Sequence, residues 1–335
     1  MKKNLTILMM PGVKHNALFA VLGGMMALAI GAHQFLSFVY TAAAETPSGN
    51  LVLSSAEVPN NDPFVDIQLE AHSAYVYDLA YNKVLFAHRE GEKRPLASIT
   101  KLMTALVARE RASESAVVVI ESGDLAVEGD TGLLTGERWR NEDLVKLMLL
   151  VSSNDAARAI ASFVGSEGQR AYGIIPGDTG RAQFVHMMNE RAHAEGFTTM
   201  EFLNESGLDI KHAADSSPSL RQPGGLGSAR DVAMLITLLW KKFPDTVEIT
   251  AQKDTRIVSQ DGRMHNLQNT NEITGRIPGL VASKTGYTDL AGGNLAVIFD
   301  IEIGHPLVAV VLGSSYKGRF EDMEKLVAAA LRTRN

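Results

Sequence analysis

Short β-rich runs lie near the two ends of the sequence, and helical patterns occupy the middle. Residues 74–87 hold two such runs separated by a turn, which indicates a hairpin. Residues 280–312 hold three apolar runs, whereas apolar residues recur at helical spacing in 142–163, 182–194 and 228–240. This order predicts an α/β fold of the α+β type: an antiparallel sheet built from both ends of the chain, with an inserted all-helical lobe. The expected active site is a cleft where lobe and sheet meet.

The first 44 residues follow the order of a secretory signal. Three lysines stand within the first 14 residues, apolar residues dominate 17–40, and alanines follow at 42–44. The apolar part is long for a cleaved signal and approaches the roughly 20 residues that span a bilayer. Residues 1–44 are therefore either a signal peptide or an N-terminal membrane anchor. Both alternatives place the remainder outside the cytoplasm, in the periplasm or at the extracytoplasmic face of the cell membrane.

Breaking residues mark the boundary between this segment and the folded part. Proline, asparagine, serine and glycine interrupt any periodicity in 45–68, which indicates a linker, and 69–335 is the expected folded domain. The last helical pattern, at 320–331, ends close to the last residue of the sequence. The apolar N-terminus is therefore the only membrane attachment that we expect.

Composition limits the classes of partner and cofactor. The sequence has no cysteine, which excludes disulfides and thiolate metal sites. A net charge of -6 without a basic stripe argues against nucleic acid as a partner. His186, Glu190 and His193 fall on one helical face, but a single helix that supplies every ligand is more typical of a solvated surface. We expect neither a metal nor another cofactor.

A serine and a lysine stand three residues apart at the start of an apolar helical pattern. Pro95 fits a helix entry, and on a helix Ser98 and Lys101 share one face, so their hydroxyl and amine can come within hydrogen-bonding reach. A lysine can act as the base for such a hydroxyl if burial lowers its pKa. The same spacing recurs at Ser314 and Lys317, in an expected loop, so the pair alone decides nothing.

Two further motifs follow in order. Ser152-Ser153-Asn154 interrupts an apolar helical region, and Lys284-Thr285-Gly286 directly follows the apolar run 280–283. With these three motifs the sequence resembles the low-molecular-mass penicillin-binding proteins of the D-alanyl-D-alanine carboxypeptidase family, over about residues 70–331. The resemblance implies a fold like that of β-lactamases and transpeptidases.

The chemistry of the first two motifs gives each residue a role. We expect Ser98 to attack a carbonyl and Lys101 to take its proton, which yields an acyl-enzyme. Ser152 can relay a proton to the leaving amine, and Asn154 can hold Lys101 and the substrate amide. The alternative for the second motif is a cluster that only caps a helix.

The third motif is expected to recognise the substrate. Lys284 would favour a neutral Lys101 by repulsion and attract the substrate carboxylate, and Thr285 would hydrogen-bond it. Gly286 would let the strand approach the substrate closely. The resemblance also implies an oxyanion hole from the backbone N–H groups of Ser98 and Tyr287. It further implies a second carboxylate contact at Arg319, whose alternative is a solvated charge at a helix start.

The family resemblance implies a serine-type D-Ala-D-Ala carboxypeptidase that trims peptidoglycan stem peptides. β-Lactam antibiotics are then expected as acylating inhibitors, and the N-terminus as a route to membrane association. Three alternatives stay open: a DD-endopeptidase that cleaves cross-links, a serine β-lactamase, and a non-catalytic cell-wall-binding module. Residues 201–204 are one residue short of the loop with which class A β-lactamases deacylate, which disfavours the second alternative.

Overall fold

The computed structural model describes residues 62–334 apart from 126–127, 130, 171–177 and 211–220. The predicted signal or anchor at 1–44 lies outside the described residues, as does most of the predicted linker. Contacts divide the chain into two units, Met1–Asn60 and Asn61–Asn335. Among the described residues, no helix is both long and apolar enough to cross a membrane.

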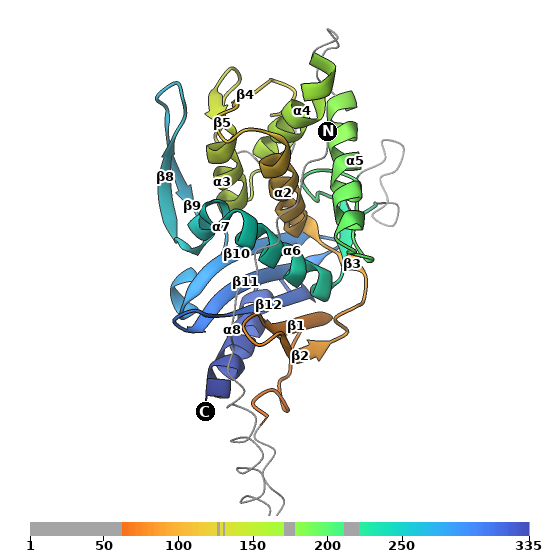
Figure 1. Cartoon of the computed structure of the whole chain (residues 1–335), viewed down its shortest axis with the longest axis vertical. Coiled ribbons are helices and arrows are strands. Elements are labelled where there is room, and N and C mark those ends of the chain that lie inside the picture. Colours follow the sequence, from red (N-terminus) through yellow and green to blue (C-terminus); the bar gives the residue numbers. More distant parts are fainter. Residues whose placement is uncertain (1–61, 126–127, 130, 171–177, 211–220, 335) are drawn as a thin grey trace, which may run out of the picture. The chain divides into compact units, whose positions relative to one another are not determined.

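One antiparallel sheet of five strands draws on both ends of the described chain. Strands β1 (Ser73–Asp78) and β2 (Lys83–His88) come from its start, and β10 (Leu280–Thr288), β11 (Gly292–Glu302) and β12 (His305–Ser314) come from its end. The strand order is β10-β11-β12-β1-β2 (Figure 1). Within it β1 pairs with β12 over its whole length, so the predicted joining of the two ends is confirmed.

The inserted lobe contains most of the helices. In chain order these are α2 (Lys101–Arg111), α3 (Asn141–Val151), α4 (Asn154–Arg170), α5 (Asp178–Ala194), α6 (Ala229–Lys242) and α7 (Pro244–Val247). Short strands accompany them: β3 (Arg94–Pro95), β4 (Val117–Val119), β5 (Arg138–Arg140), β6 (Glu201–Phe202), β7 (Gly225–Gly227), β8 (Asp254–Val258) and β9 (Met264–Gln268). The lobe is therefore mainly helical but holds small antiparallel sheets, β3-β7-β6, β4-β5 and β8-β9, that the sequence pattern did not predict.

The sheet has a separate hydrophobic cluster on each face. In β12, Val308 and Val310 belong to the cluster shared with the helical lobe, whereas Leu307 and Ala309 belong to the cluster shared with α8 (Gly318–Leu331). This alternation follows from the two-residue period of a strand. Figure 1 shows α8 on one side of the sheet and the lobe on the other. The sheet thus forms a middle layer, which explains why its central strand β12 is apolar and buried on both faces from Leu307 to Leu312.

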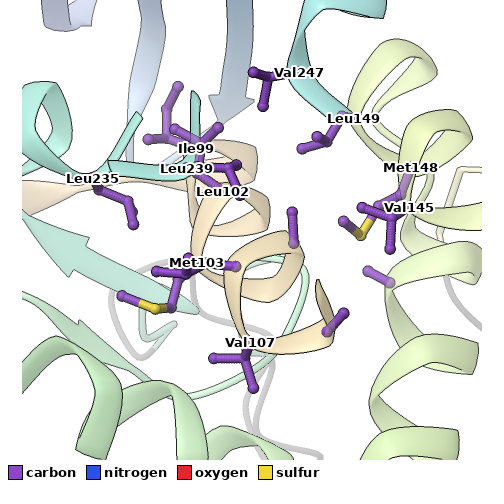
Figure 2. Packing of buried hydrophobic residues seen from close by; sticks show 14 of the residues in the cluster. Ile99, Leu102, Met103, Val107, Val145, Met148, Leu149, Leu235, Leu239 and Val247 are labelled. Carbon is purple, nitrogen blue, oxygen red and sulfur yellow. The ribbon is translucent and has the colours of Figure 1, made fainter. Parts of the chain in front are cut away.

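Helix α2 lies in the middle of the lobe and is buried on nearly every side. Figure 2 shows its apolar side chains meeting those of α3 and α6, together with Val247 of α7. Leu102, Met103 and Leu106 are each at most 1% exposed, and burying such a side chain stabilises a fold by about 1.5–3 kcal/mol. The helix is therefore held firmly, and so is the turn that precedes it.

The predicted linker extends too far towards the C-terminus. Phe64 is only 5% exposed, and its ring stacks on Phe86 of β2 with the centroids 5.6 Å apart. The carbonyl of Gln68 also accepts a hydrogen bond from Lys325 on α8. Residues 62–68 thus pack on the folded unit. The reason is that Phe64, which lies among residues that break periodicity, is buried in the hydrophobic cluster shared by the sheet and α8.

Candidate active site

The turn before α2 carries Ser98. Residues Ala97–Thr100 form one 3-10 turn, and α2 continues from Lys101, so the chain is helical from the position predicted. Ala97 adopts a left-handed conformation with φ 48°, which is unfavourable for a residue with a Cβ. Surrounding contacts must hold this turn, since the strain would otherwise be released.

A glycine and an asparagine from distant segments hold the nucleophile turn. A Cβ on Gly207, which has φ 80°, would stand 1.9 Å from the carbonyl oxygen of Ala97. From the sheet, the Asn294 amide donates hydrogen bonds of 3.0 Å to the carbonyls of Pro95 and Leu96. Neither Asn294 nor the contact of Gly207 was predicted, because both depend on segments at least 100 residues away along the chain.

Gly286 makes a close approach, but to a different partner from the one expected. A Cβ on Gly286 would lie 2.8 Å from the Leu96 carbonyl oxygen and 3.2 Å from the Ser98 nitrogen. The glycine therefore lets β10 pass directly beside the turn that carries the nucleophile. We expected the glycine to serve closeness to the substrate, but the contact that the structure shows is with the nucleophile turn.

The Lys101 amine lies at the centre of the site and is fully buried. Its Nζ atom is 2.9 Å from Ser98 Oγ, 2.7 Å from Asn154 Oδ1 and 2.9 Å from the carbonyl oxygen of Ser206. Burial lowers the pKa of Lys101 to about 7, against the opposing charge of Glu205. A neutral amine has two hydrogens, which Asn154 and Ser206 can accept, and one lone pair, which can accept the proton of Ser98.

Lys284 projects from β10 and pairs with the second serine. Its Nζ donates to Ser152 Oγ at 2.9 Å and to the Thr285 carbonyl at 2.8 Å. The pKa of Lys284 lies well below its usual value, first because the amine is buried and then because Lys101 and Arg319 repel its charge. We expected this repulsion to act on Lys101, but burial is the main influence there.

The Ser152-Ser153-Asn154 motif forms the turn between α3 and α4. Ser152 is left-handed with φ 60°, and the chain reverses there. Ser153 Oγ accepts a hydrogen bond of 3.0 Å from the Ala156 nitrogen, so this central residue caps α4. The outer two residues contact Lys284 and Lys101 instead, and the capping alternative holds for Ser153 alone.

Arg319 is buried at the start of α8, which excludes the alternative of a solvated charge. Only 3% of the residue is exposed. Its Nη1 donates to the Gly286 carbonyl at 3.0 Å, and the guanidinium lies 4.4 Å from the centre of the Tyr316 ring. Burial is the main reason that its pKa is lowered. Arg319 thus supports the strand that carries Gly286 and also faces the cavity described next.

A cavity of about 430 Å³ opens in front of Ser98. Among the predicted residues, it is lined by Ser98, Ser152, Thr285, Gly286, Tyr287 and Arg319. The other three lie behind it: Lys101 contacts Ser98, Lys284 contacts Ser152, and Asn154 contacts Lys101. The lining also includes residues to which we assigned no role, namely Gln268, Asn269, Thr270, Glu272 and Tyr316. The Thr270 and Thr285 hydroxyls are 2.5 Å apart.

The three residues weighed as metal ligands lie on α5. His186 and Glu190 form an exposed pair 3.2 Å apart. Within the described ranges, no three His, Asp or Glu side chains are grouped so that they could hold a metal ion.

An antiparallel sheet, a mainly helical lobe and a serine beside a buried lysine are together the features of a serine hydrolase. Residues 56–316 match the model of the D-alanyl-D-alanine carboxypeptidase family, and the chain belongs to this family. The resemblance seen in the three motifs is thereby confirmed.

Curated relatives include enzymes of two activities. The D-alanyl-D-alanine carboxypeptidase DacB2 of Mycobacterium tuberculosis is 29% identical over 224 residues, which cover 66% of this chain and 67% of the relative. A D-alanyl-D-alanine endopeptidase of Haemophilus influenzae is 29% identical over 274 residues, which cover 79% of this chain and 84% of the relative.

Two solved structures share the fold over more than nine-tenths of their own length. A D-alanyl-D-alanine carboxypeptidase from Mycobacterium tuberculosis superposes with a TM-score of 0.65 and 26% identity, covering 79% of this chain and 92% of that one. Penicillin-binding protein D2 from Listeria monocytogenes, in its ampicillin-bound form, gives a TM-score of 0.62 and 26% identity, covering 79% and 98%. The predicted β-lactamase/transpeptidase-like fold is confirmed.

Proposed function

We propose that this protein is a serine-type D-Ala-D-Ala carboxypeptidase that removes the terminal D-alanine from peptidoglycan stem peptides. The observation that carries the proposal is the place of the Lys101 amine, 2.9 Å from Ser98 Oγ and with a pKa lowered to about 7. A neutral amine in that position can activate the hydroxyl near neutral pH. Membership of the carboxypeptidase family supports the substrate class.

Acylation begins with Ser98. Its Oγ attacks the carbonyl carbon of the penultimate D-alanine while its proton passes to Lys101. The carbonyl oxygen becomes negative and accepts hydrogen bonds from the backbone N–H groups of Ser98 and Tyr287. The path of β10 supports this assignment, because Gly286 holds the strand directly beside the Ser98 nitrogen.

The C–N bond then breaks, and the leaving amine needs a proton. Lys101 holds the proton that it took from Ser98. The Ser152 hydroxyl, whose Oγ is 2.9 Å from Lys284 Nζ, can relay this proton to the leaving amine. The carboxylate of the leaving D-alanine binds at the cationic end of the cavity, between the Thr285 hydroxyl and Arg319. Water finally attacks the ester carbonyl, the ester bond breaks and Ser98 regains its proton.

β-Lactams should acylate the same serine. Attack on the ring carbonyl opens the ring, but the amine stays tethered to the acyl group and can block water. The ampicillin-bound form of the Listeria protein supports this ligand class. Glu201 is the glutamate in the stretch that we compared with the deacylation loop of class A β-lactamases. It pairs with Lys93 on the surface, 2.6 Å away, and is not among the described residues that line the cavity. Its position therefore supports slow hydrolysis of the penicillin ester.

The remaining alternatives differ in what leaves the site. A DD-endopeptidase would use the same acyl-enzyme and release a cross-linked stem peptide, and the Haemophilus relative supports keeping it in view. A non-catalytic wall-binding module would not need Lys101 to be buried beside Ser98. For its location, we propose export to the periplasm or the outer face of the cell membrane, on the basis of residues 1–44.

Fluorescent penicillin and a pentapeptide ending in D-Ala-D-Ala together test the proposal. The protein should bind the penicillin covalently at Ser98 and release D-alanine from the pentapeptide, with little turnover of penicillin. Rapid penicillin hydrolysis would identify a β-lactamase instead. Release of products from a cross-linked dimer alone would identify an endopeptidase, and no labelling would contradict the acyl-enzyme. Detection of residues 1–44 on the mature protein by mass spectrometry would favour an anchor over a cleaved signal.

A further inference from the structure

The cavity in front of Ser98 holds one carboxylate among its cations. Arg319 lines the cavity and Lys284 lies behind it, and both suit the terminal carboxylate of a D-alanine leaving group. Glu272 lines the same cavity, and its negative charge partly offsets the lowering of the Arg319 pKa that burial causes. A carboxylate at this end repels the substrate carboxylate, so D-alanine recognition gives no reason for Glu272.

The backbone around Glu272 is fixed. Its neighbours Asn271 and Ile273 are 2% and 0% exposed, and the Asn271 side chain accepts a hydrogen bond of 3.2 Å from the Ile273 nitrogen. The Asn269 side chain accepts another, of 2.8 Å, from the Asn271 nitrogen. Glu272 is exposed between these buried neighbours, so the fold presents its carboxylate at the rim of the cavity.

The cavity is also larger than a D-alanine requires. Its volume of about 430 Å³ lies within the range of about 300–1,000 Å³ that holds drug-sized ligands. The lining also includes Gln268, Asn269 and Tyr316, whose ring centre lies 4.4 Å from the Arg319 guanidinium. A leaving residue with a longer side chain therefore has both the room and an anionic group to meet.

We propose that Glu272 adapts the leaving-group side of this site to a residue that carries an ammonium group on its side chain. The inference rests on the proposed function, since the leaving residue is defined by attack of Ser98. The reaction is otherwise unchanged: the peptide C–N bond breaks, the Ser98 ester forms and the leaving amine takes the proton. Glu272 forms an ion pair with the side-chain ammonium, while Thr285 and Arg319 bind the carboxylate of the same residue.

Three peptides that differ only in the last residue separate charge from size. They end in D-Ala-D-Ala, D-Ala-D-norleucine and D-Ala-D-lysine, and norleucine has a four-carbon side chain like that of lysine but without the amine. We expect kcat/KM for the lysine peptide to exceed that for the norleucine peptide by about 1.5- to 5-fold at low ionic strength, as for an exposed ion pair. Salt should reduce this ratio towards one.

Two substitutions at Glu272 and one elsewhere complete the test. Glu272→Gln should abolish the preference for lysine over norleucine while D-Ala-D-Ala cleavage persists, and Glu272→Asp should retain part of it. Glu302→Gln removes the same charge from an exposed position at the far end of β11 and should leave the ratio unchanged. An equal ratio in wild type and Glu272→Gln would overturn the inference alone. Inactivity of the wild type on all three peptides would overturn the proposed function and the inference with it.

Discussion

The Lys284 amine donates a 2.9 Å hydrogen bond to the Ser152 hydroxyl, which joins the edge strand β10 to the turn between α3 and α4. On the other side of the site, Lys101 Nζ lies 2.9 Å from Ser98 Oγ. Each serine thus has its own buried lysine. The two pairs suit the two proton transfers of the proposed reaction. A proton is removed from Ser98, and a proton is delivered to the leaving amine through Ser152.

Ser98→Ala should abolish covalent labelling by penicillin and lower kcat for the pentapeptide by about 10³-fold or more, because no ester can form. Gel fluorescence and release of D-alanine measure the two effects. Ser314→Ala removes the serine of the other copy of the motif, which is hydrogen-bonded to Asp322 and away from the cavity lining, and should still label. Label retained in the first variant would contradict the assignment of the nucleophile.

Acylation should accelerate as pH rises through about 7. Lys101 has a pKa lowered to about 7 by burial, so it is mostly protonated at pH 6 and mostly neutral at pH 8, and only the neutral amine can accept a proton. Rates of penicillin acylation between pH 5.5 and 8.5 measure this dependence. Lys101→Arg keeps a cation that does not deprotonate and should acylate slowly at every pH. A rate independent of pH in the wild type would argue against Lys101 as the base.

Gly286→Ala should slow acylation and destabilise the protein by about 1–3 kcal/mol. The added methyl would stand 2.8 Å from the Leu96 carbonyl oxygen, so β10 must move away from the nucleophile turn. Thermal unfolding and acylation rates measure both effects. The control is Gly275→Ala, where a Cβ would meet no atom of the described residues within 4 Å. Equal behaviour of the two variants would show that the close contact is unimportant.

Asn294→Ala should lower kcat more than it raises KM, because Asn294 positions the turn and does not line the cavity. Loss of its buried hydrogen bonds should cost about 1–3 kcal/mol and lower Tm by several degrees. Steady-state kinetics and thermal melting test these expectations. Asn266→Ala, an exposed asparagine on β9, should change neither quantity. A rise in KM alone would instead indicate that Asn294 contacts the substrate.

The sequence predicted the joined sheet and the residues of the three motifs, because local patterns carry both. Periodicity distinguishes strand from helix, and Ser98, Lys101 and Lys284 each stand in a short recognisable motif. Contacts between distant segments leave no such pattern in the sequence, so they could not be predicted from it. The partner of Gly286 is a carbonyl 190 positions earlier in the chain, and its identity required the fold.

The predicted C-terminal end of the linker was wrong for a related reason. Prolines and asparagines in 45–68 break periodicity whether or not the segment packs on a domain. Only the position of Phe86 on β2 shows that Phe64 is covered. The effect of Lys284 on Lys101 was likewise misjudged, since the degree of burial, which dominates the pKa of Lys101, is a property of the assembled site.

The central position of β12 in the sheet has a consequence for how the protein is made. Strand β1 leaves the ribosome early, but its partner β12 is completed only at Ser314. Lys284, Gly286 and Asn294 also come from this late part of the chain. A nascent chain can thus form the apolar helices before it has any means of holding Ser98 in its strained turn. Catalytic competence should arise late in synthesis, in one step, when the C-terminal strands close the sheet.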